Sequence, residues 1–166
     1  YYSGSDHLSF SFLDALAGTL YVIAVIFSCT AIHYIGLGIA QITQQTVPLI
    51  CTSGTASLNY APAITEAYYQ HVPLLVLTTD RPPEWIDQRD GQTIRQRNIY
   101  ANHIKDSFEL PIDNEHPDAD WQINRTISEA INLSQQEPKG PVHVNIPLRE
   151  PLYPTDDIVF DKNVKV

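Results

Sequence analysis

The sequence has 166 residues, the size of one ordinary domain, and 43% of them are hydrophobic. Charged residues make up only 17%, and 10 Lys and Arg against 19 Asp and Glu give a formal net charge of −9. This composition excludes an intrinsically disordered chain, because disorder requires little apolar material together with high net charge. We expect no nucleic-acid partner, since no basic cluster could form a phosphate-binding face.

The two cysteines, Cys29 and Cys51, are too few for a framework of disulfide bonds, and no signal peptide is visible. We therefore expect a reducing, cytoplasmic location. The sequence contains no Met, so we expect a processed product or a fragment of a longer protein.

The charges are unevenly placed, because residues 15–65 contain no Asp, Glu, Lys or Arg. Residues 16–40 are apolar enough to raise the hypothesis of a membrane span. Polar residues interrupt this stretch and no Lys or Arg flanks it, so we expect no membrane span. A buried strand followed by a buried helix has the same composition.

Along the chain, apolar runs rich in β-branched residues alternate with helical patterns. The expected strands are 20–27, 47–51, 73–79, 104–110 and 142–146. The expected helices are 30–41, 56–71 with an early kink at Pro62, and 117–136. This alternation predicts an α/β fold: a three-layer domain with a mostly parallel central sheet flanked by helices. We expect the domain to span 1–154 and 155–166 to form an exit linker.

Ligands of parallel sheets bind at the carboxyl ends of the strands, and two loops there draw attention. In the first, residues 51–56 (CTSGTA), Gly54 permits a tight turn, while Ser53 and Thr55 either cap the next helix or donate to a ligand. A simple capped turn remains the alternative interpretation of this loop.

The second loop follows the strand 73–79 and contains Arg81, which is stiffened by the two prolines after it. A guanidinium held in this way can bind a carboxylate with two parallel hydrogen bonds. Gln92 and Arg95 follow at a spacing that could face the same cleft. The alternative is a solvated polar loop. No Cys/His spacing predicts a metal site in this chain.

Five stretches together resemble the pyrimidine-binding domain of thiamine-diphosphate enzymes. They are residues 51–56 (CTSGTA), 59–63 (NYAPA), 73–84 (PLLVLTTDRPPE), 91–96 (GQTIRQ) and 140–153 (GPVHVNIPLREPLY). Within that group, the pair DRPPE and GQTIRQ is similar to the synthases of 2-succinyl-5-enolpyruvyl-6-hydroxy-3-cyclohexene-1-carboxylate in menaquinone biosynthesis. Another thiamine-diphosphate lyase or synthase, or a non-catalytic α/β domain that binds small anions, stays as an alternative.

The resemblance implies a reaction. Such enzymes decarboxylate 2-oxoglutarate on thiamine diphosphate and add the succinyl unit to isochorismate. Mg²⁺ and the diphosphate are held mainly by a downstream domain that this chain lacks, and the active site forms between subunits of a homo-oligomer, a dimer or tetramer. We therefore expect the chain alone to be inactive.

The resemblance also assigns roles to residues. It places Gly54, Thr55 and Asn59 beside the aminopyrimidine ring of the cofactor. It assigns Arg81, Gln92 and Arg95 to binding of the substrate carboxylates, and no metal ligand to this chain.

The first thirty-odd residues depart from the family pattern. Counting back from Cys51 without gaps puts Cys29 where the family has the glutamate that hydrogen-bonds the aminopyrimidine. A thiol is a poor substitute, because it is a weak acceptor with a much higher pKa. We therefore assign no catalytic residue in this chain. The explanations are a degenerate relative, an altered sequence record over this segment, which we favour, or another residue that does the work.

Overall fold

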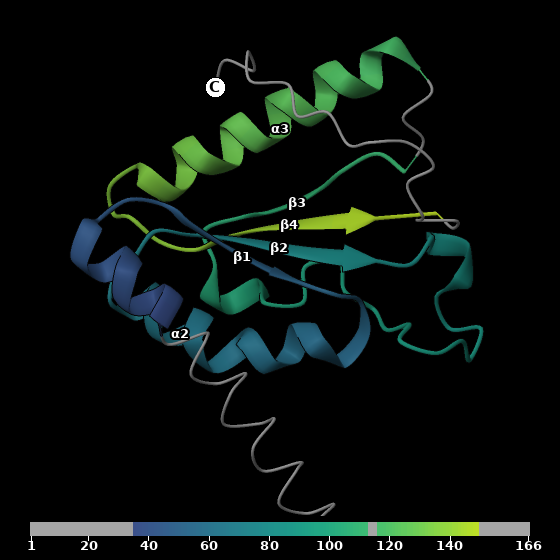
Figure 1. Cartoon of the computed structure of the whole chain (residues 1–166), viewed down its shortest axis with the longest axis horizontal. Helices are drawn as coiled ribbons and strands as arrows, with labels where there is room; N and C mark the ends of the chain where they lie inside the picture. The colour runs from purple at the N-terminus through teal and green to yellow at the C-terminus, as the bar shows by residue number, and fades with distance from the viewer. Residues whose placement is uncertain (1–34, 113–115, 150–166) are drawn as a thin grey trace, which may run out of the picture. The chain divides into compact units, whose positions relative to one another are not determined.

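The computed structural model describes residues 35–112 and 116–149 (Figure 1). The predicted strand 20–27, Cys29, most of the apolar stretch 16–40 and the linker 155–166 lie outside these described residues. In the part that is described, no helix is long and apolar enough to span a bilayer.

The described strands form one sheet in which every pairing is parallel. They are β1 (Val47–Cys51), β2 (Leu74–Asp80), β3 (Ser107–Glu109) and β4 (Val142–Pro147), in the order β1-β2-β4-β3. The two central strands, β2 and β4, are buried along most of their length, as expected for strands covered on both faces. The predicted parallel sheet is confirmed.

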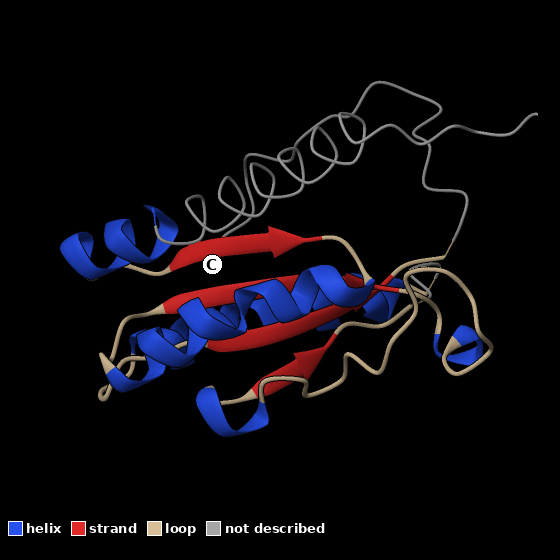
Figure 2. Ribbon diagram, turned by 90° about the horizontal axis from the view of Figure 1, so that it is seen from below, coloured by secondary structure: helices blue, strands red, loops and turns tan. Residues whose placement is uncertain are grey.

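Helices cover both faces of this sheet. The α-helix α3 (Pro117–Gln135) lies on one face, and α2 (Ala61–Tyr69) lies on the other (Figures 1 and 2). The chain also contains a helical segment at 35–43 and the short 3₁₀ helices η1 (Gly54–Tyr60), η2 (Pro83–Trp85) and η3 (Ala101–His103). The predicted three-layer α/β architecture is therefore correct.

Two expected elements differ from the structure. The single helix predicted over 56–71 is a 3₁₀ helix followed by α2, and Pro62 lies in the first turn of α2. Proline is favourable there, because the first N–H groups of a helix have no partner within it. The interruption expected at Pro62 is thus a change from 3₁₀ to α-helix between Tyr60 and Ala61. The strand predicted over 104–110 is formed only at Ser107–Glu109.

Each layer contact has its own hydrophobic cluster. Leu74 and Val76 of β2 pack with Ile64 of α2 and with the 35–43 segment. The alternate residues Leu75 and Leu77 pack with α3 and with the valines of β4. This two-residue period is what a pleated strand imposes. It also means that His143 and Asn145, which alternate with those valines, face the α2 side.

Candidate functional site

The carboxyl ends of the parallel strands meet at one edge of the sheet, where sequence analysis expected a site. β1 ends at Cys51 and β2 ends at Asp80, and Thr79 Oγ1 donates a hydrogen bond to the Cys51 carbonyl at 3.2 Å. This hydrogen bond thus links the two strand ends from which the loop after β1 and the loop after β2 begin.

Gly54 occupies the turn after β1 with a φ of +83°, a conformation that residues with a Cβ rarely adopt. A Cβ at this position would lie 2.9 Å from Gln92 Cα and 3.0 Å from its carbonyl oxygen. The Gly54 N–H donates to Gln96 Oε1 at 2.6 Å, and its carbonyl accepts from Ser57 Oγ at 2.8 Å. The structure at this position therefore depends on the positive φ of Gly54, on its lack of a Cβ and on its backbone hydrogen bonds.

The neighbouring polar residues are distributed on η1. Ser53, at the N-cap of η1, makes no side-chain capping bond, so the simple capped-turn interpretation does not explain it. The side chains of Thr55 and Asn59 are exposed to solvent. They present a hydroxyl and an amide, which supply both donors and acceptors.

Arg81 directly follows β2, as predicted. Its backbone N–H donates to Asp80 Oδ1 at 2.8 Å, and its half-buried side chain places Cζ 5.9 Å from the centroid of the Trp85 ring. Pro82 is buried and η2 begins one residue later. Beside it, Arg149 forms an ion pair with Glu84 that lowers the pKa of this exposed glutamate.

Gln92 and Arg95 take different positions. The Gln92 backbone lies against Gly54, with a φ of +58° and an exposed side chain. Arg95 has an 80% exposed side chain that binds Asp87, with Nη2–Oδ2 and Nε–Oδ2 distances of 2.7 and 3.0 Å. The structure thus brings Gln92 to the first loop and pairs Arg95 within its own loop.

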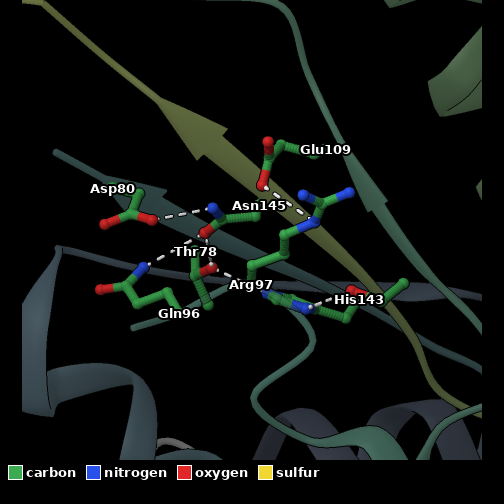
Figure 3. Close-up of polar contacts among 8 residues, drawn as sticks. Thr78, Asp80, Gln96, Arg97, Glu109, His143 and Asn145 are labelled. Carbon is green, nitrogen blue, oxygen red and sulfur yellow. Dashed lines mark hydrogen bonds and ion pairs between the residues drawn. The ribbon is translucent and has the colours of Figure 1, made fainter. Parts of the chain in front are cut away.

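Behind these loops lies a buried polar network that sequence analysis missed (Figure 3). Asn145 Oδ1 accepts from Thr78 Oγ1 at 3.0 Å and from Gln96 Nε2 at 3.3 Å. Asn145 Nδ2 donates to Asp80 Oδ2 at 2.8 Å, and Gln96 Nε2 also donates to the Thr79 carbonyl at 2.8 Å. These four side chains are at most 4% exposed, so the network underlies the loops without facing solvent.

His143 extends this network toward β3. Its Nε2 lies 2.8 Å from Thr78 Oγ1, and its Nδ1 lies 2.9 Å from Ser107 Oγ. Because the Thr78 hydroxyl has one proton and donates it to Asn145, it accepts from His143, which assigns the proton to Nε2. Burial lowers the pKa of His143 to about 4, so the ring is neutral at pH 7.

Burial also shifts two other groups at this edge. It raises the pKa of Cys51 to about 11, which keeps the thiol protonated and unsuited to nucleophilic attack at neutral pH. Burial raises the pKa of Asp80, while the hydrogen bonds from Asn145 and from the Arg81 N–H oppose that rise. Within 35–112 and 116–149, no three His, Cys, Asp or Glu side chains gather into a group that could hold a metal ion.

Comparison with known proteins identifies the class of this fold and site. The family model of the N-terminal TPP binding domain of thiamine pyrophosphate enzymes matches residues 4–105. The chain therefore belongs to this family, and its three-layer α/β fold is the pyrimidine-domain type that the sequence predicted.

More particular relatives are 2-succinyl-5-enolpyruvyl-6-hydroxy-3-cyclohexene-1-carboxylate synthases. That of Cytophaga hutchinsonii is 58% identical over 127 residues, covering 76% of this chain and 23% of the relative. That of Porphyromonas gingivalis is 44% identical over 148 residues, covering 89% and 25%, and that of Christiangramia forsetii is 46% identical over 135 residues, covering 74% and 23%. The chain thus spans about a quarter of the length of these relatives.

The described residues fit the cofactor that this family binds. Gly54 leaves the backbone without a side chain at the turn, and the exposed Thr55 hydroxyl and Asn59 amide suit the ring nitrogens and amino group of an aminopyrimidine. Cys29, at the expected position of the family glutamate, lies outside the described residues, although the family match covers it.

Proposed function

We propose that the protein containing this chain is a thiamine-diphosphate-dependent synthase that decarboxylates 2-oxoglutarate and adds the succinyl unit to isochorismate, in menaquinone biosynthesis. Residues 1–154 are its pyrimidine-binding domain, and 155–166 lead toward the next domain. The observation that carries the proposal is the packing of the Gln92 backbone on Gly54, which brings the cofactor-side loop to the substrate-side loop. The names of the relatives, which state the product of the synthase, support the choice of this reaction.

Gly54, Thr55 and Asn59 hold the aminopyrimidine ring of thiamine diphosphate in this proposal. When bound, the cofactor supplies a nucleophilic carbon that can store the electron pair released by decarboxylation. The diphosphate and Mg²⁺ are held mainly by residues of a downstream domain. The role of this chain is therefore to orient the ring end of the cofactor.

Arg81, Gln92 and Arg95 bind the carboxylates of the substrates. Isochorismate carries two carboxylates, which match two guanidinium groups. Arg81 is half-buried and held by its position after β2. Arg95 is paired with Asp87, but an exposed pair of this kind contributes little to stability, so exchange of Asp87 for a substrate carboxylate costs little.

The assembled protein is a cytoplasmic homo-oligomer, a dimer or tetramer, whose site lies between the pyrimidine domain of one subunit and the diphosphate-binding domain of another. The chain contributes no catalytic carboxylate at position 29 in its present sequence. Peptide mass spectrometry of residues 1–45 decides between a true cysteine and a sequence altered over that segment.

The test of the proposed function uses the full-length protein with thiamine diphosphate, Mg²⁺, 2-oxoglutarate and isochorismate. Release of CO₂ from 2-oxoglutarate, together with the adduct of isochorismate detected by mass spectrometry, is the expected result. Pyruvate in place of 2-oxoglutarate is the matched control and gives much slower turnover. Turnover of pyruvate without use of isochorismate would assign the protein to another reaction of the family.

A further inference from the structure

Within the described residues, the Gln96 side chain makes hydrogen bonds to Gly54, to β2 and to β4. Its side chain is fully buried, at 0% exposure. The oxygen Oε1 accepts from the Gly54 N–H at 2.6 Å, and the nitrogen Nε2 donates to the Thr79 carbonyl at 2.8 Å and to Asn145 Oδ1 at 3.3 Å. Both the oxygen and the nitrogen of the amide are therefore hydrogen-bonded to buried protein groups.

The polarity of these contacts fixes the orientation of the amide. The Gly54 N–H that faces Oε1 is a donor, and the Thr79 and Asn145 oxygens that face Nε2 are acceptors. A flipped amide would therefore place donor against donor and acceptor against acceptor. A buried amide that is matched in this way costs far more to remove than an exposed one, because its partners remain buried and unsatisfied.

The position of Gln96 links the parts of the proposed site. It binds Gly54 directly, and four residues before it the Gln92 backbone lies against the same glycine. Through Asn145 the hydrogen bonds continue to Asp80 (Figure 3). The other carboxylate oxygen of Asp80 accepts from the N–H of Arg81. One buried amide thus fixes the cofactor-side turn and the substrate-side segment against the same strand ends.

We propose that Gln96 is a positioning residue that holds the Gly54 turn and the Gln92 segment at a fixed separation for the reaction. This inference rests on the proposed function, because it concerns the alignment of cofactor and substrate in that site. Gln96 itself touches neither of them.

The first test measures hydrogen exchange in the apo full-length protein, resolved to single amides by mass spectrometry. Gln96→Met keeps the length of the side chain and removes its hydrogen bonds. We expect the Gly54 amide to exchange at least about tenfold faster in this variant. Gln122→Met, at an exposed position of α3, is the matched control and leaves this amide unchanged. Unchanged exchange at Gly54 in Gln96→Met overturns the proposal.

The second test separates positioning from loss of stability. Val142→Ala opens a cavity at the opposite end of β4, in the fully buried core. At equal loss of thermal stability, Gln96→Met should lower kcat/KM about 10–100-fold, because small misplacements of reacting groups are costly, while Val142→Ala should change it little. Equal kinetic effects of the two variants would show a merely structural role.

The third test is a rescue by pH. Gln96→Glu keeps the acceptor for Gly54 but points a second oxygen at the Thr79 carbonyl and at Asn145, with Asp80 one hydrogen bond further on. A protonated glutamate restores the donor, so the ratio of variant to wild-type kcat/KM should rise as pH falls, and that of Gln96→Met should not. A flat ratio for Gln96→Glu contradicts the proposal. If the wild-type protein shows no turnover at all, the proposed function fails, whereas the exchange of Gly54 still decides whether Gln96 holds the turn.

Discussion

Replacement of Gly54 by alanine tests the geometry of the candidate site most directly. At a φ of +83°, an added Cβ costs about 1–2 kcal/mol in backbone strain. The Cβ would also lie 2.9 Å from Gln92 Cα and 3.0 Å from the Gln92 carbonyl oxygen, and both are backbone atoms that cannot rotate away. Overpacking of this kind costs about 1–3 kcal/mol, so Gly54→Ala should lower the free energy of unfolding by about 2–5 kcal/mol in total.

The assay is urea denaturation of the chain followed by circular dichroism, with thermal unfolding as a second measure. For a chain of this size the loss corresponds to a fall in Tm of roughly 4–20 °C. Gly38→Ala is the matched control, because Gly38 is in the helical segment 35–43 and a Cβ there meets nothing within 4 Å. Alanine should stabilise that helix by about 0.5–1 kcal/mol. A Gly54→Ala variant within about 0.5 kcal/mol of wild type, the range of ordinary surface substitutions, would refute the close approach of Gln92 to Gly54.

Three further predictions concern charge and catalysis. The pKa of His143 is about 4 in the folded chain and 6.5 when the ring is exposed, so between these pH values the unfolded chain binds more protons than the folded one. The free energy of unfolding should therefore fall by about 2 kcal/mol from pH 7 to pH 5, and His143→Gln should remove most of this pH dependence in urea denaturation. An unchanged pH dependence in the variant would argue against His143 as its source. In the full-length protein, Arg81→Lys should weaken isochorismate binding about 10–100-fold in titration calorimetry and leave the cofactor affinity unchanged, because an ammonium does not reproduce the two parallel hydrogen bonds of a guanidinium to a carboxylate. If the variant binds isochorismate as tightly as the wild type, Arg81 does not belong to the substrate site. The 166-residue chain alone should form no product from 2-oxoglutarate and isochorismate in a mass-spectrometric assay. The reasons are that it spans about a quarter of the length of its relatives and has Cys29 at the position expected for the glutamate. Measurable turnover by the chain would contradict this prediction.

The sequence was sufficient for the layers of the fold because its signals are local. β2 is largely a run of leucine, valine and threonine, and β4 alternates β-branched residues with polar ones. Gly54 lies in the loop after β1 and Arg81 directly follows β2, so their place at the carboxyl edge could be predicted. The order of the strands had no local signal, because it depends on which pairs bury the most surface.

The interior of the site was harder to predict for a related reason. Gln96 lies in a polar loop with no periodicity, and only the tertiary contact with Gly54 makes it a buried residue. Asn145 and His143 did carry a signal: polar residues at alternate positions of an apolar strand share one face. The spacing of Arg95 from Gln92 suggested that both could face the substrate cleft. That spacing could not predict that Arg95 binds Asp87 of its own loop.

The strand order also constrains how the protein is made. β3 pairs with β4 in the described sheet, and β4 is inserted between β2 and β3 although it is the last of the four to be synthesised. At a ribosomal rate of 5–20 residues per second, β3 emerges roughly 2–7 s before the partner that completes its hydrogen bonds. Asn145 and His143 arrive with that strand, so Thr78 and Asp80 wait longer still, roughly 3–13 s, without their buried partners. The contacts of this edge that involve β4 are therefore the last to form during translation, whereas those of Gly54 with Gln96 and of Cys51 with Thr79 need no residue beyond 96. Until β4 docks, β3 lacks its strand partner in the described sheet, and chaperones can recognise such an unpaired strand.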